Sequence, residues 1–429
     1  MLRTCRLQTG NGQGAAWHAP IDRLQHCTRV STDADRDVVT PANDLLYTTG
    51  WIHLAHGPRR LTVPPLHEGR YLVLALYDAW TENFANPGLR TSPRGGETVL
   101  LVGPDAPPDA GAGSGLRVLR SPTRLVWLIG RVVAGDEADL PAARALQAGI
   151  ALAADAEGPP PAAVSAWQGP PEDTVAALQA RPDEAPAIAA RFFDNLCHGL
   201  AGECVPPADA GLLAWVAAAG LQPHASFAFE QLDEPLRQGL VQGLADGVAL
   251  LVHSSRSRHA RPWALTARVG RYGSNYLVRA LTAYKGLGAL APEEALYAMG
   301  DFDAQGRALD GRVPGTLRFA PGELPPVDGF WSVTLYGEDR FLHPNAIGRH
   351  SIGDRTPGLR PDADGGLTIH VSHDPPAGEA ARANWLPAPA GRCYLVMRLY
   401  VPRPEARSWA IPPVTPVTPV APTPPEPAE

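Results

Sequence analysis

A chain of 429 residues, 45% hydrophobic and 19% charged, is long enough for two or three domains and too apolar to be intrinsically disordered. Its net charge of −7, without a basic stripe, excludes the electrostatic footprint of a nucleic-acid-binding protein. No apolar run reaches the roughly 18 to 20 residues that span a bilayer. As written, the chain is expected to be cytoplasmic, or periplasmic or secreted if its true start lies upstream.

The N-terminal segment, residues 1–34, is polar and gives no clear prediction. Within residues 35–138, short apolar or alternating runs such as YLVLALYD (71–78) and LVWLIGRVV (125–133) are separated by Gly and Pro. Runs of this length and punctuation predict the antiparallel strands of a first β-sandwich.

Residues 139–290 are expected to form a helical linker region. Asp139-Leu140-Pro141 opens it with Pro in the first turn, which is typical of a helix start. Apolar residues at three- and four-residue intervals predict further helices over 172–181, 185–200, 233–253 and 273–287, and GPPPAAVSAWQGPP (158–171) is expected to be a loop.

The β-type pattern resumes in residues 291–413, with runs such as FWSVTLY (330–336) and CYLVMRLYV (393–401). These runs predict a second β-sandwich. Residues 414–429 are rich in Pro and are expected to form a disordered tail.

One stretch of the first half recurs in the second. Relative to the pairs Leu76-Tyr77 and Leu335-Tyr336, an aromatic residue, an Asn, an Arg and a Ser recur at equal offsets in 71–92 and 330–351. These offsets favour an internal duplication. The expected fold is therefore mainly β with a helical middle: two related antiparallel β-sandwich domains, jelly-roll-like, joined by helices.

Each half also closes on an apolar strand that contains one arginine, Arg131 in the first and Arg398 in the second. A buried guanidinium is costly unless it is paired. It therefore either binds an anionic or hydroxyl-rich ligand or forms an internal structural pair.

The candidate ligand-binding residues combine Arg398 with polar and aromatic neighbours in the second half. Asn384 and Trp385 form one candidate pair, in which Trp385 is able to stack on a sugar or to cap the sandwich core. Arg349, like Asn345 and their counterparts Asn86 and Arg90, is able to line a ligand or to stabilise a turn. The complete candidate set is Tyr336, Arg349, Asn384, Trp385, Arg398 and Tyr400.

No standard catalytic motif accompanies this set, and it contains no pair of nucleophile and base. The cysteines show no CxxC spacing. His53 and His56, like His370 and His373, are three residues apart, which on a strand directs the two rings to opposite faces. No metal and no cofactor are therefore expected, and catalytic residues stay unassigned.

Several segments resemble a known family. GELPPVDGFWSVTLYG (322–337), NWLPAPAG (384–391) and LVMRLYVP (395–402) resemble the domain of unknown function numbered 1214. Residues 35–145, with DVVTPANDLLYTTGW and RSPTRLVWLIGRV, look like its usual partner, the domain of unknown function numbered 1254. The resemblance implies paired β-sandwiches around a helical linker and assigns no activity.

Three functions remain open on the sequence. The first is binding of a small polar, anionic or carbohydrate-like ligand in a β-sandwich pocket. The second is a metal-independent hydrolase or lyase, and the third is a structural or scaffolding role. The partner expected under the first is a small molecule, without nucleic acid or a membrane span, and the sequence does not specify an oligomeric state.

Overall fold

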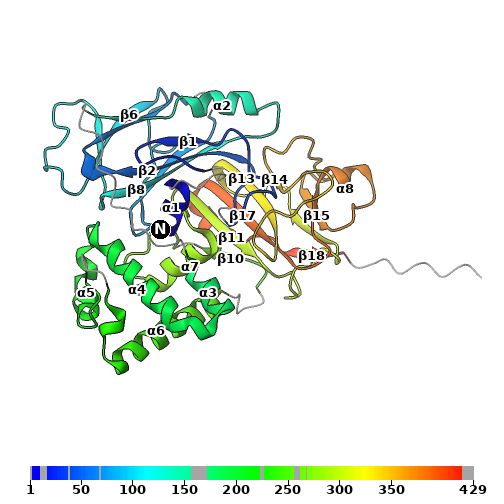
Figure 1. Ribbon diagram of the computed structural model, residues 1–429. Helices are drawn as coiled ribbons and strands as arrows, with labels where there is room; N and C mark the ends of the chain where they lie inside the picture. Colours follow the sequence, from blue (N-terminus) through cyan, green and yellow to red (C-terminus); the bar gives the residue numbers. More distant parts are fainter. Residues whose placement is uncertain are drawn as a thin grey trace, which may run out of the picture. The chain divides into compact units, whose positions relative to one another are not determined.

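A computed structural model describes residues 2–9, 17–36, 39–66, 69–155, 172–222, 227–255, 261–266 and 268–417. The chain forms two compact units. The first unit comprises Met1–Ser31, Asp37–Arg256 and Arg268–Glu294, and the second comprises Thr32–Arg36, Ser257–Ala267 and Ala295–Glu429. Figure 1 labels the elements along the chain.

The first unit contains two sheets. The five-stranded sheet has the spatial order β1 (Leu24–His26), β2 (Leu45–His53), β8 (Leu125–Val133), β4 (Leu72–Tyr77), β5 (Asn83–Ala85). The four-stranded sheet has the order β7 (Arg117–Arg120), β6 (Glu97–Val102), β3 (Arg59–Val63), β9 (Ala151–Ala154). Alternate residues of both sheets, among them Leu74, Leu128, Leu61 and Leu101, form one buried cluster, as expected for a sandwich core.

The second unit also contains two sheets. The five-stranded sheet has the order β10 (Ala264–Thr266), β11 (Ala295–Gly300), β17 (Cys393–Pro402), β13 (Val327–Gly337), β14 (Ser351–Gly353). The four-stranded sheet has the order β16 (Trp385–Pro387), β15 (Leu367–Ser372), β12 (Gly315–Phe319), β18 (Val414–Pro416). Trp331, Val333 and Met397 of one sheet pack with Leu317 and Ile369 of the other.

The two units repeat the same strand pattern. In their order across the sheet, β10, β11, β17, β13 and β14 of the second unit correspond to β1, β2, β8, β4 and β5 of the first. All pairings are antiparallel except one in each four-stranded sheet, β6 with β7 and β15 with β16, and these two occupy equivalent places. The predicted fold class, two related β-sheet halves with a helical middle, is confirmed, and its jelly-roll form stays a prediction.

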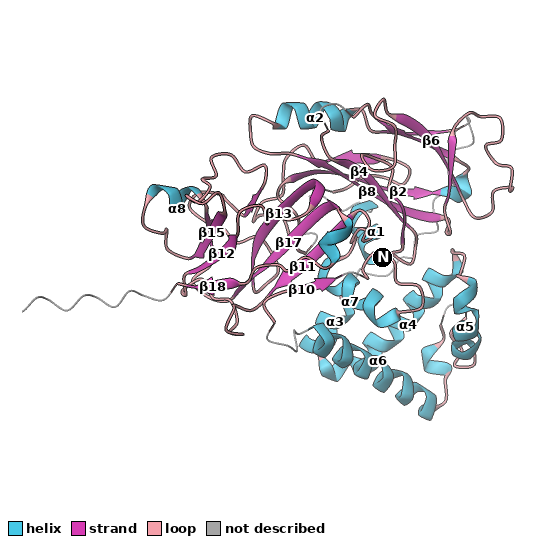
Figure 2. Ribbon diagram, turned by 180° about the vertical axis from the view of Figure 1, so that it is seen from behind, coloured by secondary structure: helices cyan, strands magenta, loops and turns pink. Residues whose placement is uncertain are grey.

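The helices of the middle region belong to the first unit. They are α3 (Thr174–Ala180), α4 (Ala185–Ala201), α5 (Ala210–Ala217), α6 (Glu234–Ser255) and α7 (Tyr276–Gly286). Two of them begin at a side-chain cap, since Asp173 accepts from Ala176 N and Asn275 accepts from Val278 N. Ile188, Cys197, Phe229 and Leu244 lie in the apolar core between these helices. Figure 2 shows α3, α4, α5 and α6 as one group of helices.

The remaining helical elements are short. They are α1 (Leu2–Thr9), α2 (Leu140–Ala148), α8 (Glu379–Ala383) and the 3-10 turns Leu54–His56, Pro182–Glu184, Pro207–Asp209, Phe229–Gln231 and Pro404–Arg407. Among the described residues, none of the helices combines the length and the apolar character needed to cross a membrane.

Four strands lie outside the two expected β regions. β1 lies in the unassigned N-terminal segment, β9 and β10 lie inside the expected helical region, and β18 lies in the expected tail. The expected tail also begins later than residue 414, because β18 pairs with β12 and buries Val414 in the sandwich core. Residues 418–429 and the expected loop at 158–171 lie outside the described residues.

Candidate functional site

The two embedded arginines occupy equivalent places in the repeated sheets. Tyr77 pairs with Trp127 across β4 and β8, and Tyr336 pairs with Tyr394 across β13 and β17. Four residues further along β8 and β17 these registers place Arg131 and Arg398. Because side chains alternate along a strand, both arginines lie on the sheet face opposite the sandwich core.

This face of the second unit is both polar and buried. Its residues on β13 and β17 include Ser332, Thr334, Tyr336, Arg398 and Tyr400, and all are buried. Tyr400 stacks on Phe330 with ring centroids 4.2 Å apart and an interplanar angle of 10°. We call this set the Arg398 face. Three of the six predicted site residues therefore lie together.

Arg398 is held by hydroxyl groups on the neighbouring strand. Its Nη1 donates to Thr334 Oγ1 at 3.0 Å and its Nη2 donates to Tyr336 Oη at 2.9 Å. Tyr297 of β11 is its partner on the other side of the ladder. The guanidinium is thus placed on β17 between strands that carry hydroxyl side chains.

Ser332 lies directly across the β13–β17 ladder from Arg398. Ser332 is 2% exposed and Arg398 is 4% exposed. Among the described residues, Ser332 Oγ has no hydrogen-bond partner. A buried hydroxyl without a partner costs about 1–3 kcal/mol.

Arg131 of the first unit has a backbone carbonyl among its hydrogen-bond acceptors. Arg131 Nη2 donates to the Gly288 carbonyl at 2.7 Å, and Tyr77 Oη donates to the same oxygen at 2.7 Å. At the places of Ser332 and Thr334 in the ladder, this unit has Val73 and Ala75. The contacts of Arg131 therefore support an internal structural role, which is one of the two alternatives given for both arginines.

The other three predicted site residues form a second group at the β16 edge. Arg349 Nη1 donates to the carbonyls of Ala383 and Trp385 at 2.8 and 3.0 Å, and burial lowers the pKa of its guanidinium. Trp385 Nε1 donates to Ser372 O at 3.0 Å. These bonds hold the edge strand β16 in place. They agree with the structural alternatives for the two residues, a turn-stabilising role for Arg349 and a core-capping role for Trp385.

Asn384 is fully engaged with the backbone. Its Oδ1 accepts from Arg360 N at 2.9 Å, and its two amide hydrogens donate to Arg360 O at 2.7 Å and Thr368 O at 3.0 Å. An asparagine with all three of these bonds joins the loop at Arg360 to β15. Its role as a ligand contact stays a prediction.

Equal offsets in the repeat do not give equal contacts. Arg90 Nε donates to the buried carboxylate of Glu294 at 2.8 Å, whereas Arg349 binds carbonyl oxygens. Asn86 donates to Asn83 Oδ1, whereas Asn345 Oδ1 accepts from Arg349 N within its own loop. The recurring residues thus support the sandwich in unit-specific ways.

His53 and His56 approach each other more closely than a continuous strand allows. β2 ends at His53, and the 3-10 turn Leu54–His56 bends the chain so that the two ring centroids are 4.7 Å apart. The expectation of opposite faces is wrong here. Asp22 Oδ2 nevertheless receives Arg59 Nη2 at 2.8 Å as well as His56 Nδ1 at 3.2 Å. Within the described part of the chain, no group of three such side chains is arranged to hold a metal.

Two buried carboxyl groups of the first unit have raised pKa values. Asp78 accepts from Trp80 N and Glu82 N, and burial raises its pKa from 3.8 to about 6. Glu203 accepts from Arg124 N and Leu125 N, and burial raises its pKa from 4.5 to about 7. Both groups bind backbone amides at the ends of loops, and in this position they act as stabilisers of local structure.

Ser332 and Thr334 were not among the predicted site residues. The signal was present in FWSVTLY, where Trp331, Val333 and Leu335 alternate with the two hydroxyl residues. Period-two alternation assigns the apolar set to the core and the hydroxyl set to the face of Arg398.

The comparisons with known proteins agree with this architecture. Residues 21–154 match the model for proteins of unknown function DUF1254, and residues 294–404 match that for DUF1214. No curated protein matches the chain. The crystal structure of the VPA0106 protein from Vibrio parahaemolyticus is 26% identical, covers 93% of this chain and 92% of its own, and has a TM-score of 0.67.

A second crystal structure, of a putative uncharacterized protein from Burkholderia cenocepacia, is 12% identical, covers 97% of this chain and 84% of its own, and has a TM-score of 0.45. The two family matches cover the sheet-forming parts of the chain, and the helices α3 to α7 lie between the two matches in the sequence. The chain belongs to the uncharacterised family that carries DUF1254 at its N-terminal side and DUF1214 at its C-terminal side.

Proposed function

We propose that the protein binds a small polar ligand with an anionic group on the Arg398 face. The observation that supports this most directly is Ser332 Oγ, which is buried, unpartnered among the described residues, and directly opposite Arg398. A guanidinium and an adjacent hydroxyl suit a carboxylate, sulfate or phosphate oxygen.

Arg398 orients the hydroxyl group of Thr334. Thr334 Oγ1 accepts a hydrogen bond from the guanidinium, so its own proton is directed elsewhere. Ser332 Oγ likewise has a proton to donate. The face therefore presents O–H donors beside a positive charge, and this combination favours an anion over a cation or a neutral alkane.

The contrast between the repeated sheets supports a ligand at only one of them. In the first unit Val73 and Ala75 lie on the same sheet face as Arg131, at two successive positions of β4 on that face. In the second unit the same two positions are the hydroxyl residues Ser332 and Thr334. Thr334 Oγ1 serves Arg398 as an acceptor, whereas Ser332 Oγ has no partner among the described residues, so the internal contacts of the arginine do not account for the serine.

A thermal-shift screen of the full chain tests the proposal, with sulfate, acetate, benzoate, glucuronate and neutral glucose as probes. A ligand at 100 times its dissociation constant stabilises the folded state by about 2.7 kcal/mol. At least one of the anions is expected to raise the melting temperature, and glucose is not.

Variants locate the effect. Ser332→Ala and Thr334→Val should weaken the response, whereas Thr316→Val, a hydroxyl-removing change on β12 in the other sheet, should leave it unchanged. The proposal is overturned if none of the anions shifts the melting temperature at about 10 mM. It is also overturned if the Ser332 and Thr334 variants respond like the parent chain, and the scaffolding role then stands.

A further inference from the structure

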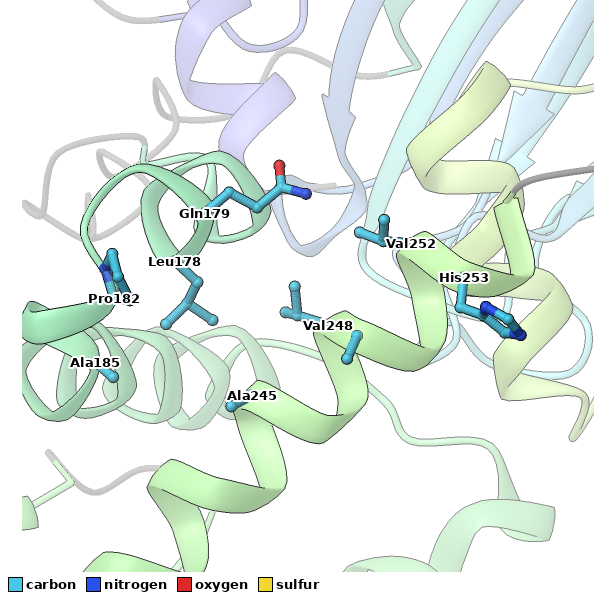
Figure 3. A pocket seen from close by; sticks show the side chains of 9 residues that line it. Leu178, Gln179, Pro182, Ala185, Ala245, Val248, Val252 and His253 are labelled. Carbon is cyan, nitrogen blue, oxygen red and sulfur yellow. The ribbon is translucent and has the colours of Figure 1, made fainter.

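A second site, unrelated to the Arg398 face, lies among the helices of the first unit. A groove of about 430 Å³ runs between α3, the turn Pro182–Glu184, α4 and α6. Its lining residues are Leu178, Gln179, Pro182, Ala185, Ala245, Val248, Ala249, Val252 and His253. Figure 3 shows Leu178 of α3 and Val248 of α6 facing each other across this space.

One wall of the groove is a stripe on α6. Ala245, Val248, Ala249 and Val252 are spaced at three and four residues, so they share one face of the helix. Two of the four are alanines, and Ala185 of α4 lies opposite. Small side chains at these positions leave open the space that larger residues would fill.

The floor of the groove is fixed by the helical core. Leu178 and Val248 pack against the cluster that contains Ile188, Phe229 and Leu244. The groove is thus formed by side chains that are already held in place, as in most small-molecule sites.

The lining also has a defined electrostatic character. None of the nine residues is an Asp, Glu, Lys or Arg, and Gln179 and His253 supply its side-chain polar atoms. A ligand with a formal charge would lose hydration here without gaining a counter-charge. An uncharged chain with one hydrogen-bonding group loses little hydration and buries apolar surface.

We propose that this groove binds an uncharged, linear aliphatic molecule with a single hydroxyl head, the hydroxyl being held by Gln179 or His253. The groove residues of α6 extend from Ala245 to His253, about 12 Å at the helical rise per residue, which is about the length of an extended chain of eight to ten carbons.

Calorimetric titration of the full chain with 1-hexanol, 1-octanol and 1-decanol tests the inference. Saturable binding at one site is expected, with affinity rising about two- to fourfold for each added methylene, because each buried methylene contributes about 0.8 kcal/mol when fully enclosed. Decanoate and decyltrimethylammonium should bind at least tenfold more weakly than 1-decanol.

Two phenylalanine variants of adjacent residues give a matched comparison. Ala249→Phe fills the groove and should weaken 1-decanol binding tenfold or more. Leu250→Phe changes a residue that is 51% exposed and does not line the groove, and it should bind within twofold of the parent. Ala245→Leu provides a smaller obstruction if Ala249→Phe disturbs the helices, as judged by circular dichroism.

The inference is overturned by the absence of saturable alcohol binding, by equal binding to the Ala249 and Leu250 variants, or by tighter binding of decanoate than of 1-decanol. A change in oligomeric state with Ala249→Phe, without alcohol binding to the parent, would instead identify the groove as a contact between copies of the chain.

Discussion

Ser332 stands opposite Arg398 in the β13–β17 ladder at the position that Val73 holds opposite Arg131 in the β4–β8 ladder. The two sheets have the same strand order, yet directly opposite the arginine the second has a serine and the first a valine. This difference between the repeated sheets is the basis for proposing a structural role for Arg131 and a ligand at Arg398.

Replacing Ser332 by Ala should stabilise the unliganded protein while weakening anion binding. The change removes a buried hydroxyl without a described partner, which relieves an expected cost of about 1 kcal/mol. The free energy of unfolding in urea, measured with and without the anion that gives the largest thermal shift, separates the effect on stability from the effect on binding. Destabilisation in both conditions would mean that Ser332 Oγ serves the fold.

Replacing Asn384 by Ala should destabilise the second unit by about 2–3 kcal/mol, because three hydrogen bonds to Arg360 and Thr368 are lost. The affinity of the remaining folded protein for the anion should stay within twofold of the parent. A large loss of affinity for the anion with unchanged stability would show that Asn384 contributes to binding.

Replacing Gly288 by Ala should destabilise the first unit by about 1–3 kcal/mol. Gly288 has φ +82°, and an added Cβ would lie 2.6 Å from Ile129 Cδ1. Gly286→Ala is the control, because nothing lies within 4 Å of its Cβ position and alanine favours the helix end. Equal melting temperatures of the two variants would contradict the close packing of Gly288 on β8.

The stability of the first unit should fall as the pH rises from about 4.5 to about 7. The pKa values of Asp78 and Glu203 are about 6 and about 7, above their ordinary values of 3.8 and 4.5. The folded chain therefore holds more protons than the unfolded chain in this window, and its advantage is lost as the two carboxyls ionise.

The expected loss from each of these two groups is about 2–3 kcal/mol. Melting temperatures of the parent and of Asp78→Asn and Glu203→Gln, measured between pH 4.5 and pH 8, isolate it. Each variant should flatten the decline. Parallel curves for all three proteins would show that neither carboxyl titrates in this range.

The fold was largely readable from the sequence because its strands and helices have strong periodicity. The repeat around Leu76-Tyr77 and Leu335-Tyr336 predicted two related halves, and the helices at 172–181, 185–200, 233–253 and 273–287 form close to those bounds. Strands of three or four residues, such as β9 and β18, are not predicted by the sequence pattern, because they form by pairing with a strand that is distant in the sequence.

The candidate site was readable only in part. Arg398 is a candidate because a buried guanidinium in an apolar strand requires partners, and the structure places it on one face with Tyr336 and Tyr400. Which loop carbonyls Arg349 and Asn384 would meet depends on tertiary contacts such as those with Trp385 and Arg360. The bend that brings His53 to His56 is likewise set by the turn after β2 and not by residue spacing.

The central claim is that the second arginine of the repeat, unlike the first, binds an anion. The most direct measurement is the affinity of Arg398→Met and of Arg131→Met for the anion that gives the largest shift with the parent chain. Arg398→Met should lose about 30-fold or more, because a hydrogen bond to a charged group contributes about 2 kcal/mol, and Arg131→Met should stay within twofold of the parent. Equal affinities of the two variants would contradict the claim, and Thr334→Val provides the same comparison if Arg398→Met does not fold.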